Sequence, residues 1–178
     1  MVVLKDINEL VDDFLMSLPC RDPSPFPEVE VSEPNERYAK ILLDAFADGT
    51  AAELTAIAQY FHHHLTIEEK AVSNLMLCIA LVEMHHLEVI GDLIAQLGGN
   101  PKYLRANRGY WQGSEVSYGD SLIQKLRLDI VSEEAAIAAY HYLLAEIQDP
   151  KIQRIIERII RDEQIHLMLF LEALKKYG

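Results

Sequence analysis

Apolar residues recur at three- and four-residue intervals along most of the chain, which is the spacing of one face of an α-helix. A short pattern of this kind covers residues 4–17. Beyond it, the spacing predicts four long helices, over residues 36–64, 66–97, 120–147 and 150–176. Gly49, inside the first of these, is expected to weaken that helix only slightly. The pattern therefore predicts an all-α chain.

Five prolines, at positions 19, 23, 25, 27 and 34, separate the short first helix from the long ones. Because proline has no backbone N–H to donate, residues 19–35 are expected to form an extended arm. We therefore expect residues 1–35 to form an N-terminal amphipathic helix and arm, and residues 36–178 to form one bundle.

The predicted connections between the long helices differ in length. Thr66 and Glu69 have the spacing of a capping box at the start of the second helix. Asp149 and Pro150 supply an N-cap and a first-turn proline for the fourth. About twenty residues lie between the second helix and the third, which is long for a compact domain. Two tight antiparallel hairpins joined by one long crossover are typical of one class of four-helix bundle.

The two predicted hairpins repeat each other at a constant offset, as from residue 53 to residue 133. The matched pairs are Glu53 with Glu133, Ala56 with Ala136, Tyr60 with Tyr140, Glu83 with Glu163, and His86 with His166. Each hairpin thus supplies one single glutamate and one Glu-x-x-His pair. Positions i and i+3 share a helix face, so the carboxylate and the imidazole of each pair point the same way.

Four glutamates and two histidines that face a bundle core are the ligands of a dinuclear metal site. Two divalent ions would neutralise four carboxylates whose burial would otherwise be costly. Ligation that is rich in oxygen and free of sulfur suits iron or manganese. The alternative is that these residues are surface acids on long helices, where a single Glu-x-x-His has little meaning.

Three further residues are candidates for support of the ligands. Tyr60 and Tyr140 lie two turns beyond the single glutamates, so their hydroxyls either bond to a ligand carboxylate or find ordinary core partners. Asp162 either holds a ligand histidine in its tautomer or forms a salt bridge. The other histidines, the run 62–64 with His85 and His141, are not predicted to bind metal. Consecutive helical residues point in different directions, and helix ends favour histidine.

Composition excludes several classes of function. The formal net charge is −12, from 28 acidic and 16 basic side chains, which disfavours nucleic acid and anionic membranes as partners. No apolar run is long enough to span a bilayer, and the acidic N-terminus does not resemble a signal peptide.

The chain has two cysteines, Cys20 and Cys78, which form no CxxC pair. We expect neither a disulfide framework nor a cysteine-ligated zinc or iron–sulfur site. Cys78 is interpreted as a small core residue. A reducing cytoplasm is the expected location.

On these residues the chain resembles the ferritin-like superfamily, and most closely the di-iron domain of rubrerythrins and their short relatives. The matching segments are ELTAIAQY at 53–60, EMHH at 83–86, EEAAIAAY at 133–140 and DEQIH at 162–166. The resemblance covers about residues 36–176. It implies a ferritin-like four-helix bundle that holds two iron ions, or manganese, and an oxidoreductase that acts on hydrogen peroxide or dioxygen.

Two departures from rubrerythrins change the expected chemistry. Ala136 stands where rubrerythrins have an additional glutamate, and two cysteines cannot form their rubredoxin-like module, so an external electron donor would be needed. Manganese catalases share the two-hairpin bundle and have similar ligands, so disproportionation of hydrogen peroxide over manganese competes with this interpretation. A non-catalytic metal-binding or iron-storage protein would also fit the ligand set, as would a coat-type bundle that binds partners. The N-terminal helix and arm favour a small homo-oligomer, with a dimer preferred, over a storage cage.

Overall fold

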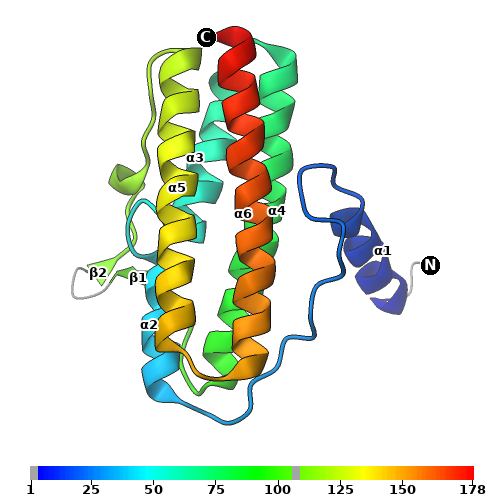
Figure 1. Cartoon of the computed structure of the whole chain (residues 1–178), viewed down its shortest axis with the longest axis vertical. Coiled ribbons are helices and arrows are strands. Elements are labelled where there is room, and N and C mark those ends of the chain that lie inside the picture. The colour runs from blue at the N-terminus through cyan, green and yellow to red at the C-terminus, as the bar shows by residue number, and fades with distance from the viewer. Residues whose placement is uncertain (1–3, 106–108) are drawn as a thin grey trace.

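The computed structural model describes residues 4–105 and 109–178, and helices make up most of them (Figure 1). The helices are α1 Leu4–Met16, α2 Glu36–Ala47, α3 Glu53–Thr66, α4 Lys70–Gln96, α5 Leu122–Glu146 and α6 Pro150–Tyr177. Two short strands, β1 Leu104–Arg105 and β2 Gly109–Tyr110, pair antiparallel, and a 3-10 turn η1 covers Gly113–Glu115. The all-α prediction is confirmed.

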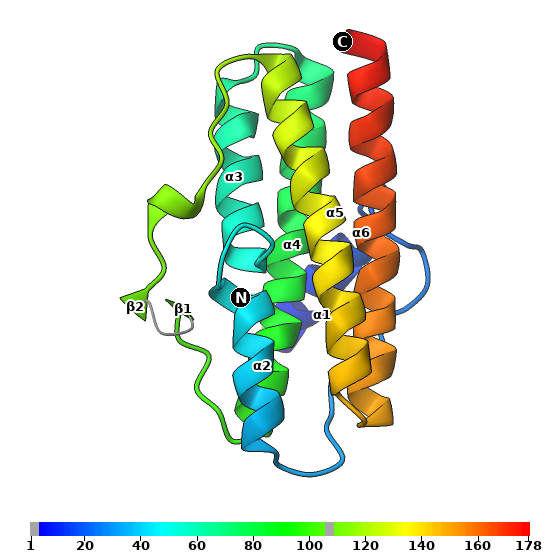
Figure 2. The same ribbon diagram turned by 60° about the vertical axis from the view of Figure 1, so that its left-hand side comes forward.

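Helices α2 and α3 follow one another in a single column, which forms the bundle together with α4, α5 and α6 (Figure 2). A tight turn joins α3 to α4, and another joins α5 to α6. The segment between α4 and α5 runs along the outside from one end of the bundle to the other, as Figures 1 and 2 both show. The predicted arrangement of two hairpins and one long crossover is therefore present.

The first column is broken, where the sequence pattern predicts one helix over residues 36–64. That prediction is wrong because Gly49 has a φ of 89°, which a right-handed helix does not accommodate. The hydroxyl of Thr55 donates to the carbonyl oxygen of Gly49 at 2.7 Å and holds the break. As a result, Glu53 lies in the first turn of a new helix rather than in the middle of a long one.

Side-chain caps mark the starts of α2, α4, α5 and α6, through Asn35, Glu69, Ser121 and Asp149. Asp149 caps α6 by accepting the backbone N–H of Lys151 at 2.9 Å, and Pro150 follows it, as predicted. The predicted capping box at the start of α4 is wrong. Glu69 is itself the N-cap, and Thr66 still belongs to α3, where its hydroxyl donates to the carbonyl of His62.

Apolar side chains form two core clusters, and they contain different ends of the same long helices. One joins α2 to the last turns of α4 and the first turns of α6, through residues such as Leu42, Ile90 and Ile156. The other joins the first turns of α4 to the last turns of α6, through residues such as Met76 and Phe170. The glutamates and histidines that the repeat singles out belong to neither cluster, whereas Tyr140 lies in the first cluster and Tyr60 in the second.

The arm, residues 19–35, contains no helix or strand, as predicted, and is tied to the bundle. Cys20 and Cys78 form a disulfide between the arm and α4, so the expectation that these cysteines would not pair is wrong. The two residues are 58 positions apart, and only the path of the arm brings them together. The division of the chain at residue 35 stays a prediction. Among the described helices, none has the length and apolar character needed to cross a membrane.

Candidate metal centre

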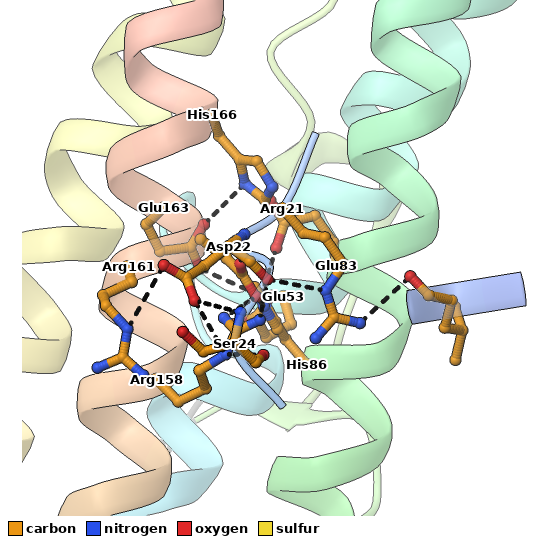
Figure 3. Close-up of polar contacts among 12 residues, drawn as sticks. Arg21, Asp22, Ser24, Glu53, Glu83, His86, Arg158, Arg161, Glu163 and His166 are labelled. Atoms are coloured by element: carbon orange, nitrogen blue, oxygen red, sulfur yellow. Dashed lines mark hydrogen bonds and ion pairs between the residues drawn. The ribbon is translucent and has the colours of Figure 1, made fainter. Parts of the chain in front are cut away.

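Four helices bring the six residues predicted as ligands to one place in the bundle core. Each single glutamate comes from α3 or α5, and each Glu-x-x-His pair comes from α4 or α6. None of the six side chains is more than 3% exposed; they are Glu53, Glu83, His86, Glu133, Glu163 and His166. Figure 3 shows five of them, all but Glu133, gathered between the helices.

The six side chains form two overlapping groups of possible ligands. One group is Glu53, Glu83, His86 and Glu163, and the other is Glu83, Glu133, Glu163 and His166. Within each group one ligand atom from every residue lies within 4.8 Å of the others. Glu83 and Glu163 belong to both groups, so they stand between the two positions.

Both histidines turn Nδ1 toward the carboxylates. His86 Nδ1 lies 3.0 Å from a carboxylate oxygen of Glu83. His166 Nδ1 lies 3.0 Å from Glu163 and 2.9 Å from the second oxygen of Glu83. Each imidazole therefore offers the same ring nitrogen to the centre of the site.

Burial and mutual repulsion govern the charges of the group. Burial raises the pKa of Glu53 and Glu133 well above the usual range, and the charges of neighbouring carboxylates add to the effect. Burial lowers the pKa of His86 and His166, but the surrounding carboxylates outweigh it and leave that pKa well above the usual value. Without a cation the site therefore retains protons that a bound metal would displace.

The donor set fits a pair of divalent cations. Four carboxylates and two imidazoles, without sulfur, suit hard or borderline metals such as manganese and iron. Two divalent ions balance four carboxylate charges, which removes the cost of burying them unpaired.

Each predicted tyrosine contacts the single glutamate of the other hairpin. The hydroxyl of Tyr60 donates to Glu133 at 2.6 Å, and that of Tyr140 donates to Glu53. Burial, with the charge of the partner carboxylate, raises the pKa of both tyrosines well above the usual value, so the hydroxyls keep their protons. The two hairpins are thus linked through the site itself.

Asp162 contacts His86 on the side of the ring that faces away from the other carboxylates. The distance between Asp162 Oδ2 and His86 Nε2 is 3.1 Å, and Arg158 Nη1 forms an ion pair with the same oxygen at 2.6 Å. Burial raises the pKa of Asp162, but its bonds to the histidine and the arginine outweigh burial and lower that pKa below the usual value. The carboxylate is therefore charged.

Sequence reasoning missed a second buried polar group that involves His63. This residue lies in the last turn of α3, as expected of helix-end histidines, but it is fully buried. Its Nδ1 lies 3.0 Å from Asp129, which also accepts from Gln59 at 2.8 Å, and its Nε2 lies 2.8 Å from the carbonyl of Tyr118. The group ties the crossover to α3 and α5. A four-residue spacing is the signal that could have found this group. It places Gln59 and His63 on one face of α3, and Asp129 on the face of α5 that carries Glu133.

A small cavity of about 10 Å³ lies beside the carboxylates of Glu53 and Glu133. This is roughly the room of one water molecule. Alanines 51, 56 and 136 form part of its wall. A larger hollow of about 570 Å³ lies between Thr66 and Lys125 and touches none of the six candidate ligands.

Comparison with known proteins gave one family and several relatives. Residues 43–177 match the family described as ferritin-like domain. The chain is 27% identical over 170 residues to a probable manganese catalase of Clostridium acetobutylicum, which covers 84% of this chain and 75% of that protein.

Two solved structures are also similar. KatB, a manganese catalase from Anabaena, aligns with a TM-score of 0.81 and 26% identity, over 89% of this chain and 80% of that one. The bacterioferritin of Desulfovibrio desulfuricans, described with a diiron site, aligns with a TM-score of 0.66 and 30% identity, over 78% of each chain.

Proposed function

Because this chain belongs to the family of ferritin-like domains, we propose that its six buried glutamates and histidines bind two metal ions and that the protein breaks down hydrogen peroxide. The resemblance to the ferritin-like superfamily that the motifs indicated is thereby confirmed. The closer resemblance to rubrerythrins stays a prediction. The observation that carries the proposal is the convergence of two overlapping ligand groups in the core.

In this proposal the ligands divide into three pairs. Glu53 and His86 would hold one ion, Glu133 and His166 would hold the other, and Glu83 and Glu163 belong to both ligand groups. The ions, when bound, would supply the exchange of electrons that peroxide chemistry requires. The protein itself orients the ligands, through the hydroxyls of Tyr60 and Tyr140, and excludes bulk water from the core.

Several features support disproportionation of peroxide over a reaction that needs an electron donor. Two molecules of hydrogen peroxide give two of water and one of dioxygen, so no other reductant enters the balance. Both cysteines are used in one disulfide, so the chain has no thiols for an electron-transfer module of its own. The cavity beside the carboxylates is too small to admit an organic substrate.

The metal we favour is manganese, with iron as the alternative. Support comes from the similarity to proteins named as manganese catalases, one of which aligns with 89% of this chain. The donor set by itself accepts either metal.

The test is to purify the protein, measure manganese and iron per chain, and follow dioxygen release from hydrogen peroxide with no reductant present. We expect about two ions per chain and one dioxygen for every two peroxides consumed. Glu133→Gln is expected to lose one of the two ions and the activity, whereas Glu134→Gln, an exposed neighbour in the same helix, serves as the matched control. Peroxide consumption that requires a reductant and releases no dioxygen would instead indicate a rubrerythrin-type peroxidase with an external electron donor. If the protein binds no metal, neither the catalase nor the peroxidase interpretation holds.

Iron storage is the second candidate, because the chain is 30% identical to a bacterioferritin over 78% of its length. A storage protein would take up far more than two irons per chain and would form a large assembly. Anaerobic loading with ferrous iron followed by air oxidation and gel filtration distinguishes the two functions.

The homo-oligomer expected from the sequence stays a proposal. Helix α1 stands beside the bundle in Figure 1, and several of its apolar side chains are exposed, among them Leu10 at 63% and Phe14 at 50%. Light scattering during gel filtration measures the mass, and a monomer would contradict the proposal.

The expected cytoplasmic location also stays a proposal. The Cys20–Cys78 disulfide weighs against it, because disulfides are typical of oxidising compartments. Cell fractionation locates the protein, and labelling of free thiols in each fraction shows whether the disulfide is formed there.

A further inference from the structure

The two histidines of the centre have the same inner contacts but different outer ones. His86 Nε2 lies 3.1 Å from the carboxylate of Asp162. His166 Nε2 is equally buried, yet it has no hydrogen-bond partner among the residues that the structure describes. The two halves of the site therefore differ just behind the ligands, although the ligands themselves match.

The internal repeat shows where this difference arises. The offset that pairs His86 with His166 also pairs Val82 with Asp162 and Cys78 with Arg158. Val82 is buried, at 1% exposed, and its side chain has no atom that can accept a hydrogen bond. The buried Arg158–Asp162 ion pair thus exists in one hairpin only. Its carboxylate contacts His86, the histidine of the other hairpin.

The N-terminal arm completes the support behind His86 (Figure 3). The backbone N–H of Asp22 donates to Asp162 Oδ1 at 2.6 Å. Arg158, which is fully buried, donates to the carbonyl oxygens of Asp22 at 2.7 Å and Ser24 at 3.2 Å. Cys20, two residues before Asp22, is bonded to Cys78 of α4. Asp162 is therefore held from the arm and from its own helix at once.

Building on the metal binding proposed above, we propose that the two metal positions are unequal, and that Asp162 and the arm make the position at His86 the tighter one. A metal-bound imidazole whose outer N–H donates to a carboxylate is fixed in orientation and tautomer and is a stronger ligand. Loss of such a partner costs about 10- to 100-fold in metal affinity. Asp162 is a positioning residue in this proposal, since it acts through His86.

The experiment is a stepwise titration of the metal-free protein with Co²⁺, followed by calorimetry and by the visible absorption of the bound ion. Repulsion between the ions would by itself split the titration into two steps. The proposal is therefore tested by finding which metal position gives the tighter step. Glu53 belongs only to the group at His86, and Glu133 only to the group at His166. We expect Glu53→Gln to remove the tighter step and Glu133→Gln to remove the weaker one. The opposite assignment would overturn the proposal.

Asp162→Asn tests the positioning role directly. We expect it to weaken the tighter step about 10- to 100-fold and to leave the weaker step unchanged. Asp129→Asn is the matched control, because Asp129 is also fully buried and bonded to a histidine, but that histidine is His63, outside the centre. Equal weakening of both steps by Asp162→Asn, or the same effect from Asp129→Asn, would show a merely structural role.

The arm is tested with Cys20→Ser combined with Cys78→Ser, which removes its anchor and leaves every candidate ligand and Asp162 intact. We expect a smaller loss of affinity confined to the tighter step. If circular dichroism shows that Asp162→Asn does not fold, the cysteine variant alone tests the proposal. An unchanged tighter step in that variant would then refute it. Absence of any Co²⁺ binding by the unaltered protein would instead contradict the proposed function.

Discussion

Reduction of the Cys20–Cys78 disulfide should lower the free energy of unfolding by a calculable amount. The bond closes a loop across a sequence separation of 58 residues. The chain-entropy relation for a loop of that length gives about 14 cal/mol/K, or about 4 kcal/mol at 25 °C. Measured effects usually fall below this figure, because the reduced unfolded chain keeps some structure, so we expect a loss of about 2–4 kcal/mol.

Urea unfolding of the metal-free protein, followed by circular dichroism with and without a phosphine reductant, measures this loss. The control is Cys20→Ala combined with Cys78→Ala, whose unfolding the reductant should leave unchanged. A shift below about 1 kcal/mol in the native chain would refute the entropic reasoning. Two free thiols in the denatured, unreduced protein would refute the disulfide itself.

Three further predictions concern the site. Tyr60→Phe removes a hydrogen bond to Glu133 and should weaken metal binding at the position of Glu133 about 10-fold in a Co²⁺ titration. Tyr177→Phe, which removes a solvent-exposed hydrogen bond to Glu69, is the control and should leave the affinity unchanged. Equal effects of the two variants would contradict the reasoning. The melting temperature of the metal-free protein should fall as pH rises from about 5 to 9, because the raised pKa of two buried carboxyls and both histidines gives stability that is present at low pH and lost as each group deprotonates. Calorimetry in a pH series checks this, with the metal-loaded protein expected to show no such fall. Ala136→Leu should fill the small cavity and slow dioxygen release while elemental analysis still finds metal at the wild-type level; undiminished release would disprove access through the cavity.

The six candidate ligands could be found from the sequence because each depends on local regularity. Helical periodicity decides which residues share a face, and the two hairpins repeat the same pattern, so Glu83 with His86 and Glu163 with His166 needed no knowledge of packing. The two short connections and the crossover followed from the positions at which the predicted long helices begin and end. These properties lie within one helix or between neighbours in the chain.

Contacts between distant segments, and one backbone angle, depended on the tertiary structure. Gly49 is compatible with a helix by its sequence, but its φ in the structure is 89°. Beside it, the hydroxyl of Ser132 in α5 donates to the carbonyl oxygen of Thr50, a contact that only the packed bundle provides. Cys20 reaches Cys78 because the extended arm follows one path among many that its sequence allows. The unequal support of His86 and His166 is the clearest case. The motifs match, but what lies behind each ring depends on which residues of other segments come within about 3 Å of it. Periodicity along one helix contains no information on that distance.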